Sequence, residues 1–303
     1  MQKNIPLSQF SNYKIGGHAL FFLKATDADD LKQDFSKFNK IFILGGGTNV
    51  LLPDEGINGL VLLNRIPGIE VHNELVKIGS GVMIDELLDF CVENNLSGLE
   101  WAGGLPGTIG AAARGNAGAF KGEIKDSVFE VESMDLISKE VRKQTNKQCE
   151  FGYRWSIYKE NPNEFITSVI LKLKKGNSEQ VKKAIDEKIE YRNLKHPMEY
   201  PNIGSTFKNI PVEEVTDKQR EEFKDFTKDD PFPVVLTTKL LALAELKGKR
   251  AGDAQISEKH PNFIVNLGNA KAYDVRKLID LAKETVKDKF GIDLEEEITY
   301  LQS

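Results

Sequence analysis

The stretch GLEWAGGLPGTIGAAARGNAGAF, residues 98–120, limits the fold of this chain more than any other part of the sequence. It contains seven glycines and six alanines. Glycine inside regular structure costs about 0.5–1 kcal/mol relative to alanine. Such a stretch therefore indicates that another group must approach its backbone closely. Either neighbouring elements or a bound molecule must lie against this backbone. A second segment, LGGGTN at residues 44–49, has the same character.

Length, charge and hydropathy exclude several classes of protein. The 303 residues are enough for two or three domains, and 40% hydrophobic and 29% charged residues are typical of a globular protein. A net charge of −5 argues against a nucleic-acid surface. Because no apolar run approaches the roughly 20 residues of a membrane span and no signal core follows Met1, we expect a cytoplasmic protein with no membrane partner. Cys91 and Cys149 lack metal-ligand spacing, and His260 with Glu258 lacks a third ligand, so no metal site is expected.

Hydrophobic periodicity predicts a mixture of strands and helices. Strands are expected where short apolar or alternating runs occur, at residues 41–44, 58–63, 74–81, 165–175 and 295–302. Helices are expected where apolar residues recur at helical spacing, at residues 84–95, 181–195 and 273–290, the last ending at Gly291. Residues 210–233 are charged and aperiodic, which indicates a surface excursion. Since helices and strands do not alternate regularly, the pattern favours α+β subdomains over a single doubly wound sheet.

Neither glycine segment matches a common nucleotide-binding motif. No G-x-x-x-x-G-K-[ST] occurs in them, and after Gly45 and Gly47 the sixth position of G-x-G-x-x-G is Val50. A plain Rossmann domain is therefore not expected. Consecutive glycines after a strand can still turn their N–H groups toward an anion, and Thr48 and Asn49 add side-chain donors. Small residues at 110–113 would let a flat ring system lie against the backbone.

Several further motifs, taken in order, carry a resemblance. NYKIGGHA, ILGGGTNVLL, the glycine stretch with its continuation KGEI, GYRWSIYK, HPMEYPNIGSTFKN and LKGKRAGDAQISEKHPNFIVN follow one another over nearly the whole chain. With the acidic terminal strand they resemble the shorter, second type of the UDP-N-acetylenolpyruvoylglucosamine reductase family. The resemblance implies an α+β fold of the vanillyl-alcohol-oxidase type. Its two FAD-binding lobes would be residues 1–65 and 66–198, and residues 199–303 would form an α+β substrate domain whose last strand returns an acidic residue to the active site.

The reaction of this family implies what the chain must bind. UDP-N-acetylglucosamine enolpyruvate is reduced to UDP-N-acetylmuramate in peptidoglycan precursor synthesis, with FAD as cofactor and NADPH as hydride-donating co-substrate. Hydride arrives at the enolpyruvyl methylene carbon and leaves an enolate-like charge, so the protein needs a cationic or hydrogen-bonding stabiliser and one placed acid.

By the same resemblance, the small residues of both glycine segments hold FAD. The first segment would bind the pyrophosphate, and the second would line the rest of the cofactor and its flavin ring. The expected cofactor residues are Gly45, Gly46, Gly47, Thr48, Asn49, Gly104, Gly107, Thr108, Gly110, Ala111, Asn116, Gly118 and Ala119. Arg114 stands where much of the family has an apolar residue, and the sequence assigns it no role.

Three residues are expected to take part in the chemistry. Arg154 in FGYRWS matches the family's active-site arginine, whose planar guanidinium can hold a carboxylate. Ser205 in NIGSTFKN matches the proton donor, which needs neighbours that stabilise its alkoxide. Glu297 matches the acidic residue of the terminal strand. The expected Pro-Glu-Val is Glu-Glu-Ile here, so Glu296 stays open as the alternative, and Thr299 replaces a common basic residue.

The resemblance also implies contacts to the UDP-sugar. The expected residues are Tyr153, Arg192, Lys208, Asn209, Lys247 and Gln255. Two other functions stay open. One is an oxygen-dependent sugar or alcohol oxidase with the same cofactor fold, although such enzymes often tether FAD through His or Cys and neither occurs in the glycine segments. The other is a UDP-sugar binding protein without catalysis.

Overall fold

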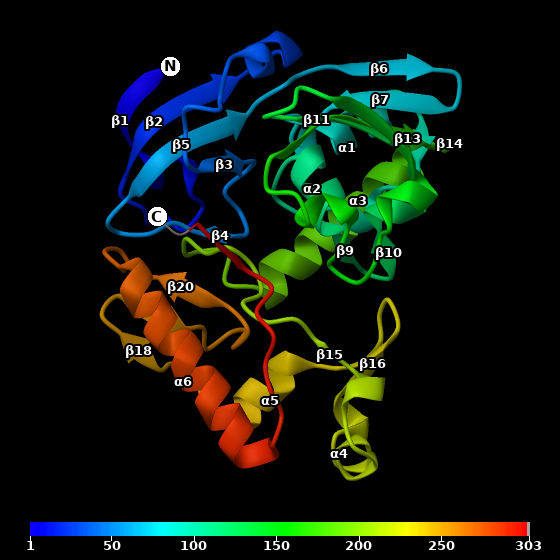
Figure 1. Ribbon diagram of the computed structural model, residues 1–303. Helices are drawn as coiled ribbons and strands as arrows, with labels where there is room; N and C mark the ends of the chain where they lie inside the picture. The colour runs from blue at the N-terminus through cyan, green and yellow to red at the C-terminus, as the bar shows by residue number, and fades with distance from the viewer. Residues whose placement is uncertain (302–303) are drawn as a thin grey trace. The chain divides into compact units, whose positions relative to one another are not determined.

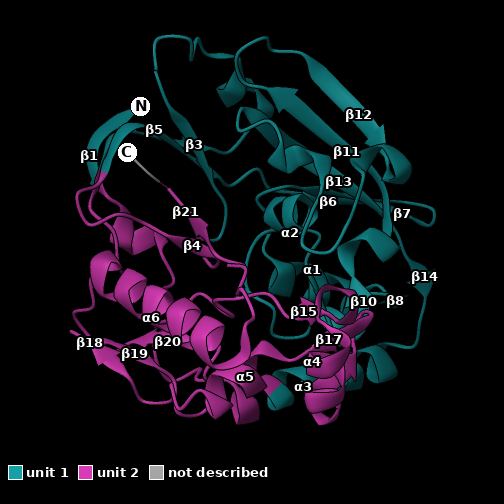
Figure 2. Ribbon diagram, turned by 60° about the horizontal axis from the view of Figure 1, so that its bottom comes forward, with its two compact units in different colours: residues 1–5, 19–46, 57–191 teal, residues 6–18, 47–56, 192–303 magenta. Residues whose placement is uncertain are grey.

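The computed structural model describes residues 1–301, and the chain divides into two compact units (Figures 1 and 2). Unit 1 comprises residues 1–5, 19–46 and 57–191, and unit 2 comprises residues 6–18, 47–56 and 192–303. Two hydrophobic clusters lie in unit 1 and one lies in unit 2. The mixture of helices and strands confirms the expected α+β character. The division into lobes at residues 65 and 198 stays a prediction.

Unit 1 contains a four-stranded sheet whose strand order is β1 (Gln2–Pro6), β2 (His18–Ala25), β5 (Ile57–Asn64) and β3 (Ile41–Leu44). Strand β5 pairs in parallel with both β2 and β3. Because both faces of this central strand are covered, its sequence is a continuous apolar run rather than an alternating one. Leu60 and Leu62 belong to the same core cluster as Phe35 and Phe165.

A second sheet of unit 1 is antiparallel, with the strand order β12 (Val141–Thr145), β11 (Val128–Asp135), β13 (Glu164–Lys172), β7 (Leu75–Gly79) and β6 (Ile69–His72). Its core cluster includes residues of α1 (Ile84–Glu93), α2 (Ile109–Gly115) and α3 (Ser178–Lys195). The apolar stripe predicted for α3 is only partly buried: Val181 and Ile185 are covered, whereas Ile189 is 37% exposed.

Short two-residue strands complete unit 1: β8 (Leu96–Ser97), β9 (Gly118–Ala119), β10 (Gly122–Glu123) and β14 (Lys174–Lys175). Short 3-10 helices connect elements of both units, at Leu7–Phe10, Ala28–Lys32, Glu100–Ala102, Ile124–Asp126, Asn146–Cys149, Ile157–Lys159, Val212–Glu214 and Lys224–Phe226.

Unit 2 is built around the long helix α6 (Ala272–Phe290), which contacts the sheet β18 (Arg250–Ala251), β19 (Ala254–Ile256) and β20 (Ile264–Asn266). The predicted apolar face of α6 is confirmed, since Val275, Leu278, Ile279, Ala282 and Val286 are buried. Gly291 ends the helix with a φ of 68°, a left-handed conformation that glycine adopts without strain.

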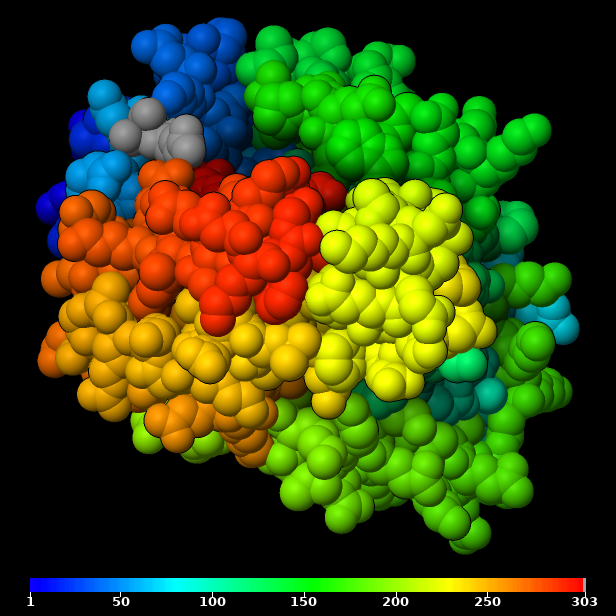
Figure 3. Space-filling view, turned by 90° about the horizontal axis from the view of Figure 1, so that it is seen from below, coloured from blue at the N-terminus to red at the C-terminus, as the bar shows by residue number. Residues whose placement is uncertain are grey.

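Residues 210–233 lie at the surface, as expected, but they are not irregular. They contain β15 (Ile210–Pro211), α4 (Asp217–Glu222) and β16 (Thr227–Asp229), followed by β17 (Pro233–Val235) and α5 (Thr237–Leu243). Figure 3 shows this segment, in yellow, beside the end of α6, in red. Phe223 is buried there, with its ring 5.6 Å from that of Phe290. The short apolar anchors were missed because charged residues surround them.

The end of the chain forms less strand than predicted. Strand β21 (Thr299–Tyr300) pairs in parallel with β4 (Val50–Leu51), and Glu296 forms an isolated bridge with Phe207. Residue 302 of the predicted strand lies outside the described residues. Across residues 1–301, no helix combines the length and the apolar character that crossing a membrane requires.

Candidate active site

The start of the first glycine segment meets the second glycine segment within unit 1. A Cβ placed on Gly45 would lie 2.9 Å from Thr108 Oγ1 and 3.2 Å from the Cβ of Ala111. The Gly45 carbonyl also accepts a hydrogen bond of 2.9 Å from Arg65, which bonds the Asn64 carbonyl as well. The end of β3 is thus held against the first turn of α2, and residues some 60 positions apart in the sequence form one surface of small side chains.

Helix α2 begins close to the end of β7. Thr108 Oγ1 accepts a hydrogen bond from the Ala111 amide at 3.4 Å and caps the helix. A Cβ on Gly110 would lie 2.7 Å from the Cβ of Ser80, so this glycine is needed for packing against the protein itself. Ala111 points the other way and is exposed. Part of the glycine stretch therefore serves internal packing, and the cofactor role of Gly110 stays a prediction.

The far end of α2 is joined to the turn that carries Arg154. Asn116 ends the helix in the left-handed conformation, with a φ of 42°, and is fully buried. Its Nδ2 donates to the Gly152 carbonyl at 2.7 Å and to Glu123 at 3.0 Å. Asn116 therefore connects α2 to the segment GYRW.

Arg154 is held in a fixed orientation by its surroundings. Its backbone is left-handed, with a φ of 55°, inside a tight turn closed by Gly152 and Trp155. The guanidinium lies 5.2 Å from the centre of the Tyr153 ring and donates to the Gly118 carbonyl at 3.0 Å. Lys159 donates to the Arg154 carbonyl at 2.6 Å. Such a preorganised guanidinium suits binding of a carboxylate.

In unit 2, Ser205 lies in a loop that one asparagine organises. Gly204, just before the serine, has a φ of 83°, in the left-handed region that favours glycine. Thr206 donates its amide to the Asn262 carbonyl at 2.7 Å, and the Asn262 side chain makes two bonds to the backbone of Phe207. These bonds fix the residues that follow Ser205.

The acidic terminal segment runs beside the same loop. The Glu297 amide donates to the Thr206 carbonyl at 2.8 Å, and the Lys208 amide donates to the Glu295 carbonyl at 2.9 Å. Asn49 Nδ2 donates to the Glu297 carbonyl at 3.0 Å. Unit 2 therefore brings together Ser205, Glu297 and the end of the first glycine segment.

The side chains of the two candidate acids have different surroundings. Glu296 accepts hydrogen bonds from Lys283, at 2.9 Å, and from the hydroxyl of Tyr300. Burial and this carboxylate raise the pKa of Tyr300. Because neighbouring residues of an extended chain point to opposite sides, Glu297 faces away from these groups. The roles of Glu297 and of the alternative Glu296 in the reaction stay predictions.

Comparisons with known proteins agree over nearly the whole chain. A family model described as UDP-N-acetylenolpyruvoylglucosamine reductase, C-terminal domain, matches residues 196–301, and an FAD binding domain model matches residues 21–141. Reductases of that name from Pseudothermotoga lettingae and Caldanaerobacter subterraneus are 36% and 34% identical, covering 97% of this chain and 95% and 91% of their own. This chain belongs to the UDP-N-acetylenolpyruvoylglucosamine reductase family. The crystal structure of the Thermus caldophilus reductase (MurB) superposes with a TM-score of 0.78 at 27% identity, covering 99% of this chain and 98% of that one.

The family membership makes this chain an FAD-dependent oxidoreductase, and unit 1 offers a surface that fits the cofactor. Along α2, Ala111 is exposed, and a Cβ on Gly115 would meet no atom within 4 Å. Gly104 is exposed too, with a φ of 69°. At these three positions a flat ring would meet no bulky side chain.

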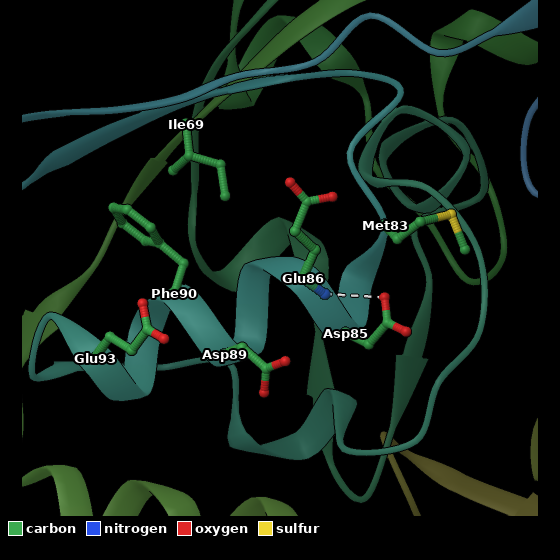
Figure 4. Close-up of a pocket in the computed structure, with 7 residues that line it drawn as sticks. All are labelled: Ile69, Met83, Asp85, Glu86, Asp89, Phe90 and Glu93. Carbon is green, nitrogen blue, oxygen red and sulfur yellow. Dashed lines mark hydrogen bonds between the residues drawn. The ribbon is translucent and has the colours of Figure 1, made fainter.

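A depression elsewhere on unit 1 does not suit the binding of this family's phosphate-bearing ligands. It lies along α1, and its walls include Ile69, Met83 and Phe90 (Figure 4). Four carboxylates also line it, those of Asp85, Glu86, Asp89 and Glu93. Like charge would repel the phosphates of FAD, NADPH and a UDP-sugar. No residue predicted for the reductase site lines this depression.

The residues predicted for UDP-sugar contacts differ in how unit 2 holds them. Asn209 accepts a hydrogen bond of 3.2 Å from the Thr237 amide, at the start of α5. Gln255 donates to the Gly248 carbonyl at 3.2 Å. Lys208 pairs with Glu295, and Lys247 is exposed. Their roles, and those of Tyr153 in unit 1 and Arg192 in unit 2, stay predictions.

Sequence reasoning missed three residues that shape the site or lie near its loops. Arg65 bonds the Gly45 carbonyl, and the only sequence signal for this bond is that Arg65 directly follows the buried strand β5. Asn262 organises the Ser205 loop, and no periodic pattern in the sequence marks it. His260 appeared only as a metal candidate. Its ring packs 5.2 Å from His196 and 4.8 Å from Phe263, and burial lowers its pKa to about 4.

Proposed function

We propose that this chain reduces UDP-N-acetylglucosamine enolpyruvate to UDP-N-acetylmuramate, with NADPH as the hydride donor, in the cytoplasm. Bound FAD supplies the hydride-transfer chemistry between the two substrates. One observation supports the assignment of catalytic roles to residues of this chain. In unit 2 the Ser205 loop pairs with the acidic terminal segment.

Arg154 binds the carboxylate of the enolpyruvyl group in this proposal. Its guanidinium can make two parallel bonds to a carboxylate, and it stays charged at any working pH. Hydride addition at the methylene carbon moves negative charge toward that carboxylate. A cation fixed before the reaction stabilises this charge more than it stabilises the substrate, which lowers the barrier.

Ser205 supplies the proton that the neighbouring carbon takes up. Its Oγ–H is a weak acid, so the surrounding backbone must hold the hydroxyl at a defined position and stabilise the alkoxide. The bonds of Asn262 to Thr206 and Phe207 fix the residues just after the serine. Glu297, bonded through its amide to Thr206, provides the second acidic group of the reaction.

The remaining predicted residues bind FAD and the UDP-sugar. The residues at 45–49 bind the FAD pyrophosphate, Asn49 through its backbone because its side chain is bonded to the Glu297 carbonyl. The residues at 104–111 and 116–119 line the flavin. The UDP-sugar contacts are assigned to Tyr153, Arg192, Lys208, Asn209, Lys247 and Gln255.

The test is whether NADPH consumption depends on the enolpyruvyl UDP-sugar in the absence of oxygen. The proposal expects one UDP-N-acetylmuramate per NADPH, identified by a product two mass units heavier than the substrate. Oxygen uptake with a sugar or alcohol donor and no need for NADPH would establish the oxidase alternative. Tight UDP-sugar binding with no turnover would establish the binding-protein alternative.

A further inference from the structure

Arg114, in the last turn of α2, is a cation to which the structure gives no partner. Within residues 1–301, no carboxylate pairs with its guanidinium and no oxygen accepts a hydrogen bond from it, although the side chain is partly buried. Burial lowers the pKa of Arg114, with no opposing negative charge nearby. In the same unit, Arg65 bonds two carbonyls and Arg142 pairs with Glu164.

A partly buried guanidinium without a protein partner has lost some of its hydration, and an anionic ligand would compensate for that loss. The position of Arg114 indicates where that ligand lies. Ala111 and Arg114 are three residues apart, so they share one face of α2, and Gly115 adjoins them. This face carries no large side chain between its two ends apart from Arg114 itself.

The two ends of α2 differ in what they adjoin. The first turn contacts Gly45, in the segment assigned to the FAD pyrophosphate. At the last turn, the Arg114 carbonyl accepts a hydrogen bond of 2.7 Å from Ser156, two residues after Arg154. A helix of seven residues is about 10 Å long. A cofactor with its pyrophosphate at the first turn, and with its flavin half directed toward Arg154, would have its flavin ring beside the last turn.

We propose that Arg114 faces the pyrimidine edge of the bound flavin and stabilises the negative charge that reduction places on N1 and the C2 carbonyl oxygen. This inference rests on the proposed function for the placement of the pyrophosphate. A guanidinium suits the role because its fork can donate to both atoms at once. It makes Arg114 a residue that tunes the cofactor, at a position where much of the family has an apolar side chain.

Two alternative roles of Arg114 predict different measurements. A basic residue in the last turn of a helix stabilises the helix through its macrodipole, which would affect unfolding but not the flavin. A guanidinium that binds the substrate carboxylate would affect the KM of the UDP-sugar but not the properties of the enzyme without substrate.

The experiment compares R114Q, R114K and R114L with the wild-type protein, using K147Q as the control. Lys147 is an exposed residue of unit 1 in a 3-10 helix, so K147Q removes one positive charge elsewhere in the same unit. R114L introduces an apolar side chain of the kind common in the family and serves the same comparison if R114Q does not fold. The readouts are the midpoint potential of the bound flavin and the dissociation constant of FAD from the apoprotein.

In R114Q and R114L we expect the affinity for reduced flavin to fall at least tenfold more than the affinity for oxidised flavin, each compared with the wild type. For a two-electron couple this lowers the midpoint potential by about 30 mV. R114K should recover part of the difference because it keeps the charge, and K147Q should match the wild type. An unchanged midpoint potential in R114Q and R114L overturns the proposal. This holds whether these variants show a raised KM for the UDP-sugar, a lowered stability or no difference from the wild type. The potential is measured without UDP-sugar, so an enzyme that binds FAD but fails to turn over would refute the proposed function alone.

Discussion

Asn49 offers a direct test of how the acidic end of the chain is held in place. The sequence assigned this residue to FAD, whereas the structure uses its side chain to bind the Glu297 carbonyl at 3.0 Å. Two backbone bonds secure the same segment, from Thr299 to the Asn49 carbonyl and from Glu297 to Thr206. Replacing Asn49 by alanine leaves these backbone bonds in place. The variant N49A should therefore fold normally and lose one restraint on Glu297.

The size of the effect follows from the bond that is lost. A neutral hydrogen bond contributes about 0.5–1.5 kcal/mol net. If all of it serves to position Glu297 in the transition state, the step that uses this residue slows about 2- to 12-fold. Reoxidation of the flavin by the enolpyruvyl UDP-sugar should slow by this factor. Reduction by NADPH and the dissociation constant of FAD should change less than twofold.

The assay is anaerobic stopped-flow absorbance of the flavin, with each half-reaction measured separately. The matched control is N94A, because Asn94 is also exposed and donates from its side chain to a backbone carbonyl, that of Phe90, at 2.9 Å. N94A should leave both half-reactions unchanged. Weakened FAD binding in N49A with normal reoxidation would refute this reasoning and return Asn49 to the cofactor. Two unaffected half-reactions would show that the bond does not position the acid.

Three further outcomes are expected. S205A should slow reoxidation by the UDP-sugar about 10²–10⁴-fold and leave reduction by NADPH unchanged, and equal slowing of both steps would make Ser205 a structural residue. G47A should lower the free energy of unfolding by about 2–5 kcal/mol, because its Cβ would lie 1.8 Å from the Phe10 carbonyl oxygen at a φ of 66°. G68A is the control, because Gly68 has a φ of 106° and open space around the new Cβ, so its free energy of unfolding should fall by only about 1–2 kcal/mol. Equal losses of stability in G47A and G68A, measured by urea unfolding, would contradict the argument. Because burial lowers the pKa of His260 to about 4, the unfolded chain binds a proton below its ordinary pKa of 6.5 that the folded chain excludes. Stability should therefore fall as the pH drops from 6.5 to 4, and H260F should show a smaller fall in urea midpoint over that range.

The parts of the fold with strong local periodicity could be predicted from the sequence. Helix α6 was expected over residues 273–290 and spans Ala272–Phe290, because its apolar face repeats over five turns and Gly291 ends it. Segment 210–233 could not be predicted in the same way. A few buried side chains, Phe223 among them, anchor short elements, and such anchors have no period to detect.

The roles of the glycines depend on contacts that no local pattern contains. The sequence showed that something must approach the stretch at residues 98–120, but not what. At Gly110 the neighbour is Ser80 of the protein itself, whereas Gly115 faces open space. The same limit applies to the two candidate acids. Alternation predicts that Glu296 and Glu297 point to opposite sides, and only the structure shows that Lys283 and Tyr300 hold the Glu296 carboxylate.

The most direct measurement of the central claim is the visible absorption spectrum of the purified protein under anaerobic conditions. NADPH and then the enolpyruvyl UDP-sugar are added in turn. The account predicts a flavin band that bleaches with NADPH and returns when the UDP-sugar is added. A band that returns only with oxygen would contradict the reductase assignment. A colourless protein that cannot be reconstituted with FAD would contradict the cofactor assignment and leave the glycine stretch with a packing role alone.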